Sequence, residues 1–325
     1  MTILVTGAAG FVGMHVAERL ARRGETVIGL DNFNAYYDPR LKIAREQRLA
    51  ALPGFTMVRG DIADEGIVTD LVMQRGVRRV VHLAAQAGVR YSLENPFAYE
   101  RSNLAGHLAV LEACRHGQVE KLVYASSSSV YGDRPIGNQG FREDEPSVQP
   151  VSLYAATKRS CELMSHCYSS LYGIPQAGLR FFTAYGPWGR PDMAYFSFTR
   201  KIERGEPIEV FAEGRMARDL TYIDDIVDGV IGVLDAPAGP GLHEVYNIGD
   251  SSPVGLMDMI RSLEQVLGRE AVKIMRPPQA GDVTSTFADI SKIKALTGYS
   301  PRIGFDEGAQ RFVDWWREEG RAILQ

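Results

Sequence analysis

Tyr154 and Lys158 lie four residues apart in the stretch Ser152–Lys158, a spacing that places both side chains on one face of a helix. A lysine ammonium beside a phenol favours the phenolate, so a tyrosine in this setting can act as a general base at neutral pH. The same chain carries a glycine-rich turn, Gly7–Gly13, close to its start. Together the two features predict that a hydroxyl group is oxidised beside a bound dinucleotide.

The glycine turn has the pattern Gly7-x-x-Gly10-x-x-Gly13 and lies between an expected strand, Ile3–Thr6, and an expected helix, Phe11–Arg23. The first glycine permits a tight bend, the second lets the backbone approach a pyrophosphate, and the third allows close helix–strand packing. The start of the helix then offers N–H groups and a favourable dipole to the phosphates. A glycine-rich turn alone could be structural, but this strand–turn–helix context indicates a dinucleotide site.

Two acidic residues follow the next two strands. The second expected strand ends at Asp31, where a carboxylate can bind the diol of an adenosine ribose. Because this carboxylate would repel a 2′-phosphate and no basic residue adjoins it, the sequence favours NAD over NADP. Asp61 follows the third expected strand, where it could bond the adenine amino group or cap a turn.

Four consecutive serines, Ser126–Ser129, follow the expected strand Lys121–Ala125. Hydroxyl groups at the carboxyl end of a strand are poor core material, because each buried hydroxyl needs a hydrogen-bond partner. A serine-rich turn is one explanation. Since Tyr154 follows in the sequence, we interpret the serines instead as a hydrogen-bonding platform for a sugar hydroxyl.

Short apolar runs alternate with amphipathic segments through the first half of the chain. The expected strands are Ile3–Thr6, Thr26–Leu30, Phe55–Arg59, Arg79–Leu83, Lys121–Ala125 and Gln176–Phe181. The expected helices include Phe11–Arg23, Asp64–Arg75, Pro96–Arg115 and Ser152–Tyr172. This alternation predicts an α/β fold, a Rossmann-type doubly wound parallel sheet with a smaller C-terminal α/β substrate lobe.

The expected elements become shorter after about residue 183, and the loops between them are rich in Gly, Pro and Arg. Val245–Ile248 nevertheless has the apolar character of one more sheet strand. We therefore expect a discontinuous boundary. Residues 1–182 and about 224–250 would form the nucleotide-binding domain, and residues 183–223 and 251–325 the substrate lobe.

Composition narrows the classes of function. With 325 residues, 45% apolar residues and a formal net charge of −4, the chain shows no sign of disorder and no basic block for nucleic acid. No apolar run approaches the ~20 residues of a membrane span, and the N-terminus is expected to be a strand and not a signal peptide. Three cysteines without paired spacing, Cys114, Cys161 and Cys167, predict buried or partly buried reduced thiols in a cytoplasmic protein, with no metal site. His82 is expected to be a core residue.

Five segments carry a resemblance that covers essentially the whole chain. They are Leu30–Pro39, Ala87–Ser92, Ser126–Gly132, Phe181–Pro187 and Arg218–Asp225. In these segments the chain resembles the extended short-chain dehydrogenase/reductases of the nucleotide-sugar epimerase/dehydratase class, and most closely the UDP-glucuronate 4-epimerases. The glycine turn and the Tyr/Lys pair are specific only to the superfamily. The Asn-x-Tyr-Tyr-Asp-Pro loop and the Val-Arg-Tyr-Ser segment narrow the resemblance to the uronate branch.

The resemblance implies a role for each matching position. Ser127, Tyr154 and Lys158 match the catalytic trio, and Asn103 matches an asparagine that supports the lysine or the active-site water. NAD is then expected at Gly7, Gly10, Phe11, Val12, Gly13, Asp31, Asn32, Asp61, Ile62, Leu83, Ala84, Ala85, Ala87, Asn103, Tyr154 and Lys158. The UDP-sugar is expected at Val89, Arg90, Ser127, Ser128, Ser129, Thr183, Arg190, Val210, Phe211, Arg218 and Asp282.

Within that second group, Arg190, Arg218 and Asp282 match positions that hold UDP, while Val210 and Phe211 would flank the uracil. Galactose-type epimerases have an arginine where this chain has Gln279, so recognition of the diphosphate must depend on the other arginines.

The type of reaction follows from what the serine platform lacks. Dehydratases of this class carry an Asp-Glu pair there, and uronate decarboxylases carry Glu at the position of Ser129. Since this chain has Ser128 and Ser129, no acid/base pair is available and epimerisation remains. Thr183 stands where galactose-type relatives carry Asn, and with the two serines it could clamp a carboxylate.

The expected activity is reversible NAD-dependent 4-epimerisation of UDP-glucuronate to UDP-galacturonate through a 4-keto intermediate. A 4-epimerase of another UDP-sugar, such as UDP-glucose/galactose or an N-acetylhexosamine, stays open as an alternative. UDP-glucuronate decarboxylation and a non-catalytic NAD-binding scaffold are further alternatives. Relatives pair the helices that match Pro96–Arg115 and Ser152–Tyr172 across a twofold axis, which implies a homodimer. Apolar residues lie on more than one face of these helices, among them Leu104, Leu108, Leu111, Leu163 and Tyr168.

Overall fold

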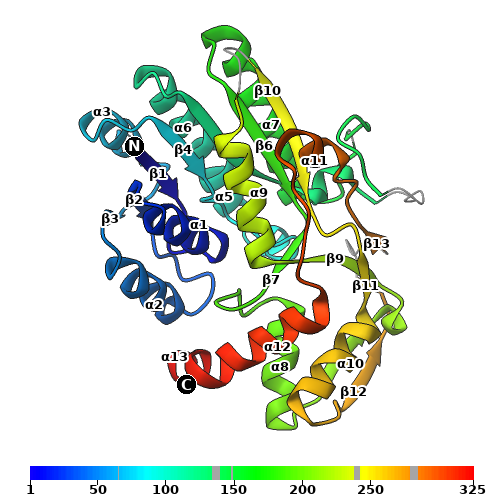
Figure 1. Ribbon diagram of the computed structural model, residues 1–325. Helices are drawn as coiled ribbons and strands as arrows, with labels where there is room; N and C mark the ends of the chain where they lie inside the picture. Colours follow the sequence, from blue (N-terminus) through cyan, green and yellow to red (C-terminus); the bar gives the residue numbers. More distant parts are fainter. Residues whose placement is uncertain (65, 134–139, 148, 238–241, 279–284) are drawn as a thin grey trace.

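The computed structural model describes residues 1–325 except 65, 134–139, 148, 238–241 and 279–284 (Figure 1). Within the described residues, seven parallel strands form the main sheet in the order β10-β6-β5-β4-β1-β2-β3. They are β1 Thr2–Thr6, β2 Thr26–Asp31, β3 Phe55–Arg59, β4 Arg79–His82, β5 Lys121–Ser127, β6 Gln176–Phe181 and β10 His243–Ile248. The prediction of a Rossmann-type parallel sheet is confirmed.

Helices cover both faces of this sheet (Figure 1). They are α1 Phe11–Arg22, α2 Pro39–Ala50, α3 Ile67–Gln74, α6 Gly106–His116, α7 Leu153–Tyr172 and α9 Ile223–Asp235. Ile3 and Val5 of β1 pack in one core with α1 and α9, while Leu4 packs in a second core with α3 and α6. The near-continuous apolar runs of the inner strands follow from this arrangement, because both of their faces are buried, whereas the edge strand β3 is partly exposed.

Five strands of the sheet differ from the expected bounds by one or two residues, and β5 and β10 differ most. β5 continues through Ser126 and Ser127, which pair with Arg180 and Phe181 of β6. The chain after β10 returns to the lobe, but β10 itself lies beside β6, from His243 opposite Gln176 to Ile248 opposite Phe181. The prediction that Val245–Ile248 belongs to the sheet is therefore confirmed.

The expected helix Pro96–Arg115 is present in three consecutive parts. They are α5 Pro96–Tyr99, a π-helical segment Glu100–Ala105, and α6. A short helix, α4 Tyr91–Glu94, precedes them. The expected helix Asp64–Arg75 begins later, at Ile67, because Gly66 adopts a left-handed φ of 86° just before it.

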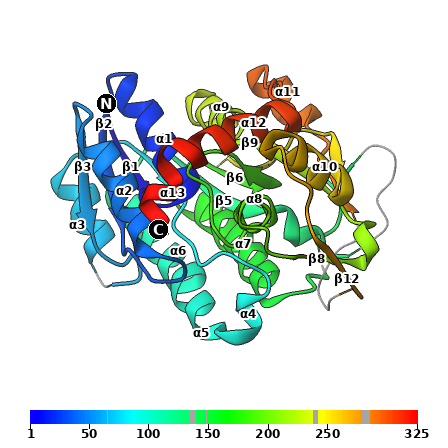
Figure 2. The ribbon, with the colours of Figure 1, turned by 90° about the horizontal axis from the view of Figure 1, so that it is seen from below.

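The second lobe is built from short strands and amphipathic helices. Its strands are β7 Thr183–Tyr185, β8 Ile208–Phe211, β9 Ala217–Tyr222, β11 Pro253–Gly255, β12 Lys273–Arg276 and β13 Ser285–Thr286. Its helices are α8 Ala194–Arg204, α10 Leu256–Leu267, α12 Phe305–Trp315, a π-helical segment Trp316–Gly320, and α13 Arg321–Leu324, whereas α11 Ser291–Thr297 packs on α9 and β10. Figure 2 shows α10, β8 and β12 toward the end of the molecule opposite to β3 and α3.

The burial of one histidine and three cysteines was expected from the sequence. His82 ends β4 as a buried residue bonded to Thr6 Oγ1 at 2.7 Å, as expected of a core histidine. Cys114 and Cys161 are buried thiols, but Cys167 is exposed, which corrects the expectation for that residue. Cys167 lies on the outer side of α7, and sequence alone does not show which side of a helix faces solvent. None of the described helices has the length and apolar character needed to span a bilayer.

Candidate active site

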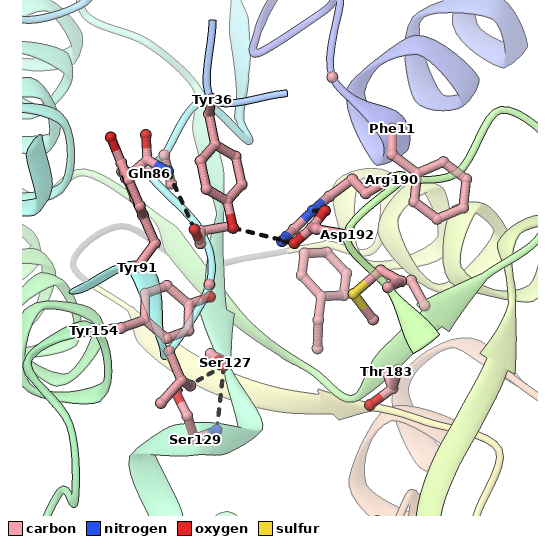
Figure 3. Close-up of a pocket in the computed structure, with 18 of the residues that line it drawn as sticks. Phe11, Tyr36, Gln86, Tyr91, Ser127, Ser129, Tyr154, Thr183, Arg190 and Asp192 are labelled. Carbon is pink, nitrogen blue, oxygen red and sulfur yellow. Dashed lines mark hydrogen bonds and ion pairs between the residues drawn. The ribbon is translucent and has the colours of Figure 1, made fainter. Parts of the chain in front are cut away.

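A cleft of about 990 Å³ lies at the carboxyl ends of the sheet strands and is closed on the other side by the second lobe (Figure 3). Its lining begins at the glycine turn, passes the ends of β4 and β5, and reaches Phe211 and Arg218 in the lobe. In open α/β sheets, ligands bind at this edge of the strands. Most residues predicted from the sequence to bind cofactor or substrate line this cleft.

The glycine turn has the geometry that a pyrophosphate site requires. Gly7 adopts a left-handed φ of 71°, and its N–H donates to Leu30 O at 2.7 Å. A side-chain carbon at Gly13 would lie only 2.0 Å from Gly7 O, and one at Gly10 would lie 2.8 Å from the same oxygen. The first turn of α1 carries no acidic residue, so its N–H groups are free of a competing carboxylate.

Asp31 lies at the end of β2 and lines the cleft. Its carboxylate accepts hydrogen bonds from the N–H groups of Ala9 at 3.1 Å and Phe33 at 2.9 Å. The expectation that no basic residue adjoins Asp31 is wrong, because Lys42 Nζ from α2 lies 3.6 Å from Asp31 Oδ1. Lys42 is distant from Asp31 in the sequence but reaches it because α2 folds back along the end of β2.

Asp61 and Asn103 do not line the cleft, but their side chains hold neighbouring segments in place by hydrogen bonds. Asp61 accepts bonds from Ala63 N at 2.9 Å and Asn32 Nδ2 at 3.2 Å, the geometry of a turn cap. Burial opposes its charge, but these bonds lower the pKa of Asp61 below its ordinary value. Asn103 Oδ1 accepts from Gln86 N at 2.8 Å, while Nδ2 donates to Gln86 O at 3.1 Å and Thr157 Oγ1 at 3.0 Å. Asn103 therefore fixes the segment after β4 against α7.

Ser127, Tyr154 and Lys158 come from two elements and meet at one wall of the cleft. Ser152 caps α7 by accepting from Ala155 N at 3.1 Å, so Tyr154 lies in the first turn of the helix and Lys158 in the second. Lys158 is buried, and its Nζ donates to Ala125 O of β5 at 2.9 Å. Figure 3 shows the Tyr154 ring and Ser127 facing the same hollow.

The four serines divide into two functions. Ser126 is buried and donates to Glu162 Oε1 at 2.6 Å, so it belongs to the structural core. Ser127 Oγ accepts from Ser129 Oγ at 2.9 Å and from Ser129 N at 3.2 Å (Figure 3). Ser127 and the 3₁₀ turn Ser128–Tyr131 that follows it thus present three hydroxyls to the cleft, while the fourth is turned away.

The opposite wall carries a charged cluster that the sequence did not reveal. Arg190 Nε donates to Asp192 Oδ1 at 3.1 Å, and Tyr36 OH donates to Asp192 Oδ2 at 3.1 Å (Figure 3). Burial opposes the charge of Asp192, but Arg190 lowers the pKa of Asp192 below its ordinary value. Burial, followed by the charge of Asp192, raises the pKa of Tyr36 to about 12. Tyr36 lies in the Asn-x-Tyr-Tyr-Asp-Pro loop. This loop was part of the family resemblance, but the sequence did not predict that Tyr36 contacts Asp192.

The end of β8 separates two residues that were predicted to act together. Val210 is fully buried in the core of the lobe, whereas Phe211 lines the cleft. Successive side chains of a strand point to opposite faces, so the Val210 side chain cannot flank a ligand in the cleft, which corrects that prediction. Arg90 lies over the Phe211 ring at 5.4 Å from its centroid. This contact joins the segment after β4 to the lobe.

The remaining substrate positions predicted from the sequence lie partly in the cleft lining and partly outside the described residues. Arg218 and Thr183 line the cleft, from β9 and β7 respectively. Asp282 and Gln279 lie outside the described residues. Other lining residues were not found from the sequence, and among them are Asn34, Tyr36, Lys42, Gln86, Tyr91 and Asp192. In the described part of the chain, no cluster of three or more His, Cys, Asp or Glu side chains could hold a metal ion.

Comparison with known proteins gives one consistent family. UDP-glucuronate 4-epimerase 5 of Arabidopsis thaliana is 46% identical over 331 residues, which covers 97% of this chain and 75% of that protein. A UDP-glucuronic acid 4-epimerase from Bacillus cereus, solved with UDP-glucuronic acid and NAD, has a TM-score of 0.91 at 36% identity, covering 98% of this chain and 99% of that one. A UDP-glucose 4-epimerase from Thermotoga maritima, solved with UDP-glucose, has a TM-score of 0.87 at 28% identity, covering 98% and 99%.

The family model for the NAD dependent epimerase/dehydratase family matches residues 3–249. That span includes the glycine turn, the serine segment and the Tyr154/Lys158 helix described above. The chain therefore belongs to the NAD-dependent epimerase/dehydratase family.

Proposed function

We propose that the protein catalyses the reversible 4-epimerisation of UDP-glucuronate and UDP-galacturonate with bound NAD. The observation that carries the proposal is the wall formed by Ser127, Tyr154 and Lys158 in a cleft that begins at the glycine turn. The relatives named UDP-glucuronate 4-epimerase, and the Bacillus cereus structure with UDP-glucuronic acid and NAD, support the same assignment.

The residues of the cleft fit NAD. Its pyrophosphate fits the turn at Gly7 and Gly10, where a side chain would collide with the backbone, and the start of α1 offers N–H donors. Asp31 offers a carboxylate to the adenosine ribose, and Lys158 is placed to order the second ribose. Bound NAD would supply the hydride acceptor and donor of the reaction.

Side chains of the protein then remove the proton from the sugar O4 and later return it. Tyr154 takes the O4 proton as general base, and Ser127 hydrogen-bonds the same oxygen. Lys158, whose Nζ donates to Ala125 O at 2.9 Å, holds a positive charge at the same wall of the cleft. After the 4-keto sugar turns within the cleft, Tyr154 returns the proton to the product hydroxyl. The overall reaction has no net oxidation.

The uronate poses a particular chemical problem, because a 4-keto uronate is a β-keto acid that loses CO₂ readily. An epimerase must hold the carboxylate so that its C–C bond is not aligned with the ketone π-system. Neutral hydroxyls of Ser128, Ser129 and Thr183 line the cleft and could bind the carboxylate without adding charge. Ser129 stands where decarboxylases of the class carry Glu, which weighs against that alternative.

Product analysis from UDP-glucuronate tests the proposal. Mass spectrometry of an epimerised product gives an unchanged mass, and NMR gives the inverted configuration at C4. Loss of CO₂ from the product would favour the decarboxylase, and turnover of UDP-glucose at the higher rate would favour another UDP-sugar. Absence of any product with a protein that binds NAD would favour a scaffold.

We also propose a homodimer formed by α6 and α7. Leu108 of α6 is 43% exposed and Leu163 of α7 is 53% exposed, as an apolar contact between subunits requires. Leu111 does not contribute, because it is fully buried in the subunit core. Two buried thiols, Cys114 and Cys161, are free and suit a reducing compartment such as the cytoplasm, where we place the protein.

The division of labour between the two parts of the chain completes the proposal. We assign NAD binding to residues 1–182 and about 224–250, and UDP-sugar binding to residues 183–223 and 251–325. The pairing of β10 with β6 supports the discontinuous boundary.

A further inference from the structure

Arg45 of α2 is a fully buried guanidinium with four oxygen partners. Its Nη1 donates to Ala9 O at 2.9 Å and to Tyr37 OH at 2.6 Å. Its Nη2 donates to Trp188 O at 2.5 Å and to Gly189 O at 3.2 Å. None of the carboxylates that the structure describes forms an ion pair with Arg45, and its Nε has no hydrogen-bond partner.

The carbonyl groups bound by Arg45 belong to the two halves of the cleft. Ala9 lies inside the glycine turn, and its N–H is held from the other side by Asp31. Trp188 and Gly189 directly precede Arg190, which bonds Asp192 and lies over the Tyr36 ring in the charged cluster of the cleft. One side chain therefore fixes the peptide at the expected pyrophosphate site and the backbone that carries Arg190.

The charge of Arg45 is compensated only by dipoles. Buried cations are costly unless an anion or several good hydrogen bonds stabilise them. Lys42, one turn earlier on the same face of α2, is also buried and lies 3.6 Å from Asp31. Asp31 and Lys42 thus balance each other, which leaves the positive charge of Arg45 directly behind the turn. The phosphates of a dinucleotide would supply the missing negative charge on the other side of that turn.

His15 lies near the positive charges of Arg45 and Arg48, and its imidazole is held in the neutral form. His15 Nε2 lies 3.1 Å from Pro187 O, in the same stretch of backbone that Arg45 holds. The pKa of His15 is lowered to about 4, mainly by burial and in smaller part by the charges of Arg45 and Arg48, against the bond to Pro187 O and the charge of Glu18. His15 is therefore neutral, and it contributes a hydrogen bond but no competing charge.

We propose that Arg45 is a positioning residue that couples the NAD half of the cleft to the diphosphate half. Occupation of the turn by NAD stabilises the guanidinium, and the guanidinium holds the Trp188–Arg190 backbone in the arrangement that binds UDP. The inference rests on the proposed function for the role of Arg190. Coupling between two ligands is reciprocal, so UDP must strengthen NAD binding by the same factor that NAD strengthens UDP binding.

Arginine is suited to this position in a way that lysine is not. The guanidinium presents its donors in a planar fork, so Nη1 and Nη2 can bond backbone on opposite sides at once. A lysine keeps the charge but concentrates its donors at one nitrogen. The Tyr37 ring, whose centroid lies 5.5 Å from Arg45 Cζ, further fixes the plane of the fork.

Arg45→Lys therefore tests position rather than charge, and Arg48→Lys is its matched control. Arg48 lies one turn later on α2 and 5.7 Å from the centroid of the Trp188 ring, but it pairs with Glu18 and does not bond these carbonyls. Isothermal titration of the full-length protein would give Kd for NAD, and Kd for UDP with and without saturating NAD. We expect roughly tenfold coupling in the parent and in Arg48→Lys, within the usual range for linked sites. In Arg45→Lys we expect both ligands to bind more weakly and the coupling to fall to about unity.

Two results would overturn the proposal. The first is a parent protein whose Kd for UDP is the same with and without NAD, a measurement that needs no variant to fold. The second is a folded Arg45→Lys that has a lower Tm but retains the parent's coupling, which would make Arg45 a purely structural residue. Neither readout depends on turnover, so a protein that couples NAD and UDP but does not epimerise UDP-glucuronate would sink the proposed function alone.

Discussion

Ser126 donates a hydrogen bond of 2.6 Å to Glu162, which ties the serine end of β5 to the helix that carries Tyr154 and Lys158. Arg180 of β6 donates two further bonds to the same carboxylate, at 2.8 and 2.9 Å. All three side chains of this junction are buried. Because Ser126 directly precedes Ser127, the junction sets how the catalytic hydroxyls of β5 and α7 face each other.

The Glu162 junction predicts a specific response to acid. Burial opposes the charge of Glu162, but the bonds from Arg180 lower its pKa below the ordinary value. A lowered carboxyl pKa stabilises the fold at pH above the unfolded value of ~4.3, and this stabilisation is lost as the pH falls through the folded value. Urea unfolding from pH 7 to 3 should show the free energy of unfolding falling in this acid range.

Glu162→Gln should be less stable at neutral pH by roughly 3–5 kcal/mol, because it leaves a buried arginine uncompensated. Its stability should also fall less steeply with acid than that of the parent. Ser126→Ala is the matched control, since it removes one hydrogen bond but keeps the ion pair. Parallel pH curves for the parent and Glu162→Gln would contradict the assignment.

Tyr154→Phe should abolish turnover while leaving NAD and UDP bound. The substitution removes only the hydroxyl that transfers the proton, and the ring can still pack edge-on against Tyr99, whose centroid lies 6.0 Å away. Proton transfer by a positioned group contributes typically ~10²–10⁴-fold to the rate. The measurement is kcat with saturating UDP-glucuronate, and a value close to that of the parent would sink the role of Tyr154.

Thr183→Ala should raise KM for UDP-glucuronate, because a hydrogen bond to a charged group contributes about 1.5–3 kcal/mol. Loosening the carboxylate should also release some CO₂ from the 4-keto intermediate, giving a UDP-pentose or a decarboxylated 4-keto pentose. UDP-glucose, which has no carboxylate, serves as the control substrate. Equal effects on charged and neutral sugars, without loss of CO₂, would leave the uronate preference resting on the family relationship.

Light scattering at micromolar concentration tests the homodimer. The parent should have twice the chain mass of 35.9 kDa. Leu163→Glu places a charge on the exposed apolar face of α7 and should shift the protein toward the single-chain mass. Met73→Glu, at a 57% exposed position on α3, is the control and should leave the mass unchanged. A parent of single-chain mass would count against the proposed interface.

Sequence patterns located the elements that depend on local chemistry. The bounds of β3 and β6 agree with those expected, and for β6 an apolar run between turn residues marks a buried strand. The glycine turn and the Tyr154/Lys158 pair could also be predicted, because each depends on residues that are close together in the sequence. For Phe211, the alternation of Ile208 and Val210 with Glu209 and Phe211 is the sequence signal that separates core from cleft.

The features that sequence reasoning missed depend on residues far apart in the chain. Lys42 approaches Asp31 only because α2 packs back over the end of β2. Tyr36 from the loop after β2 bonds Asp192 from the segment after β7, and Arg45 bonds Trp188 only after the lobe has folded onto the sheet. These contacts have no periodicity and no spacing in the sequence, so a single chain gives no local signal for them.

The place of β10 has a consequence for how the chain is assembled. β6 has β5 on one side and obtains its second neighbour only when β10 returns from the lobe. A fragment that ends at residue 182 would keep the glycine turn and the Tyr154/Lys158 helix but would expose the backbone of β6 along its whole length. An open edge of this kind pairs readily with other chains. Completion of the sheet during synthesis thus waits for residues of the second half of the chain.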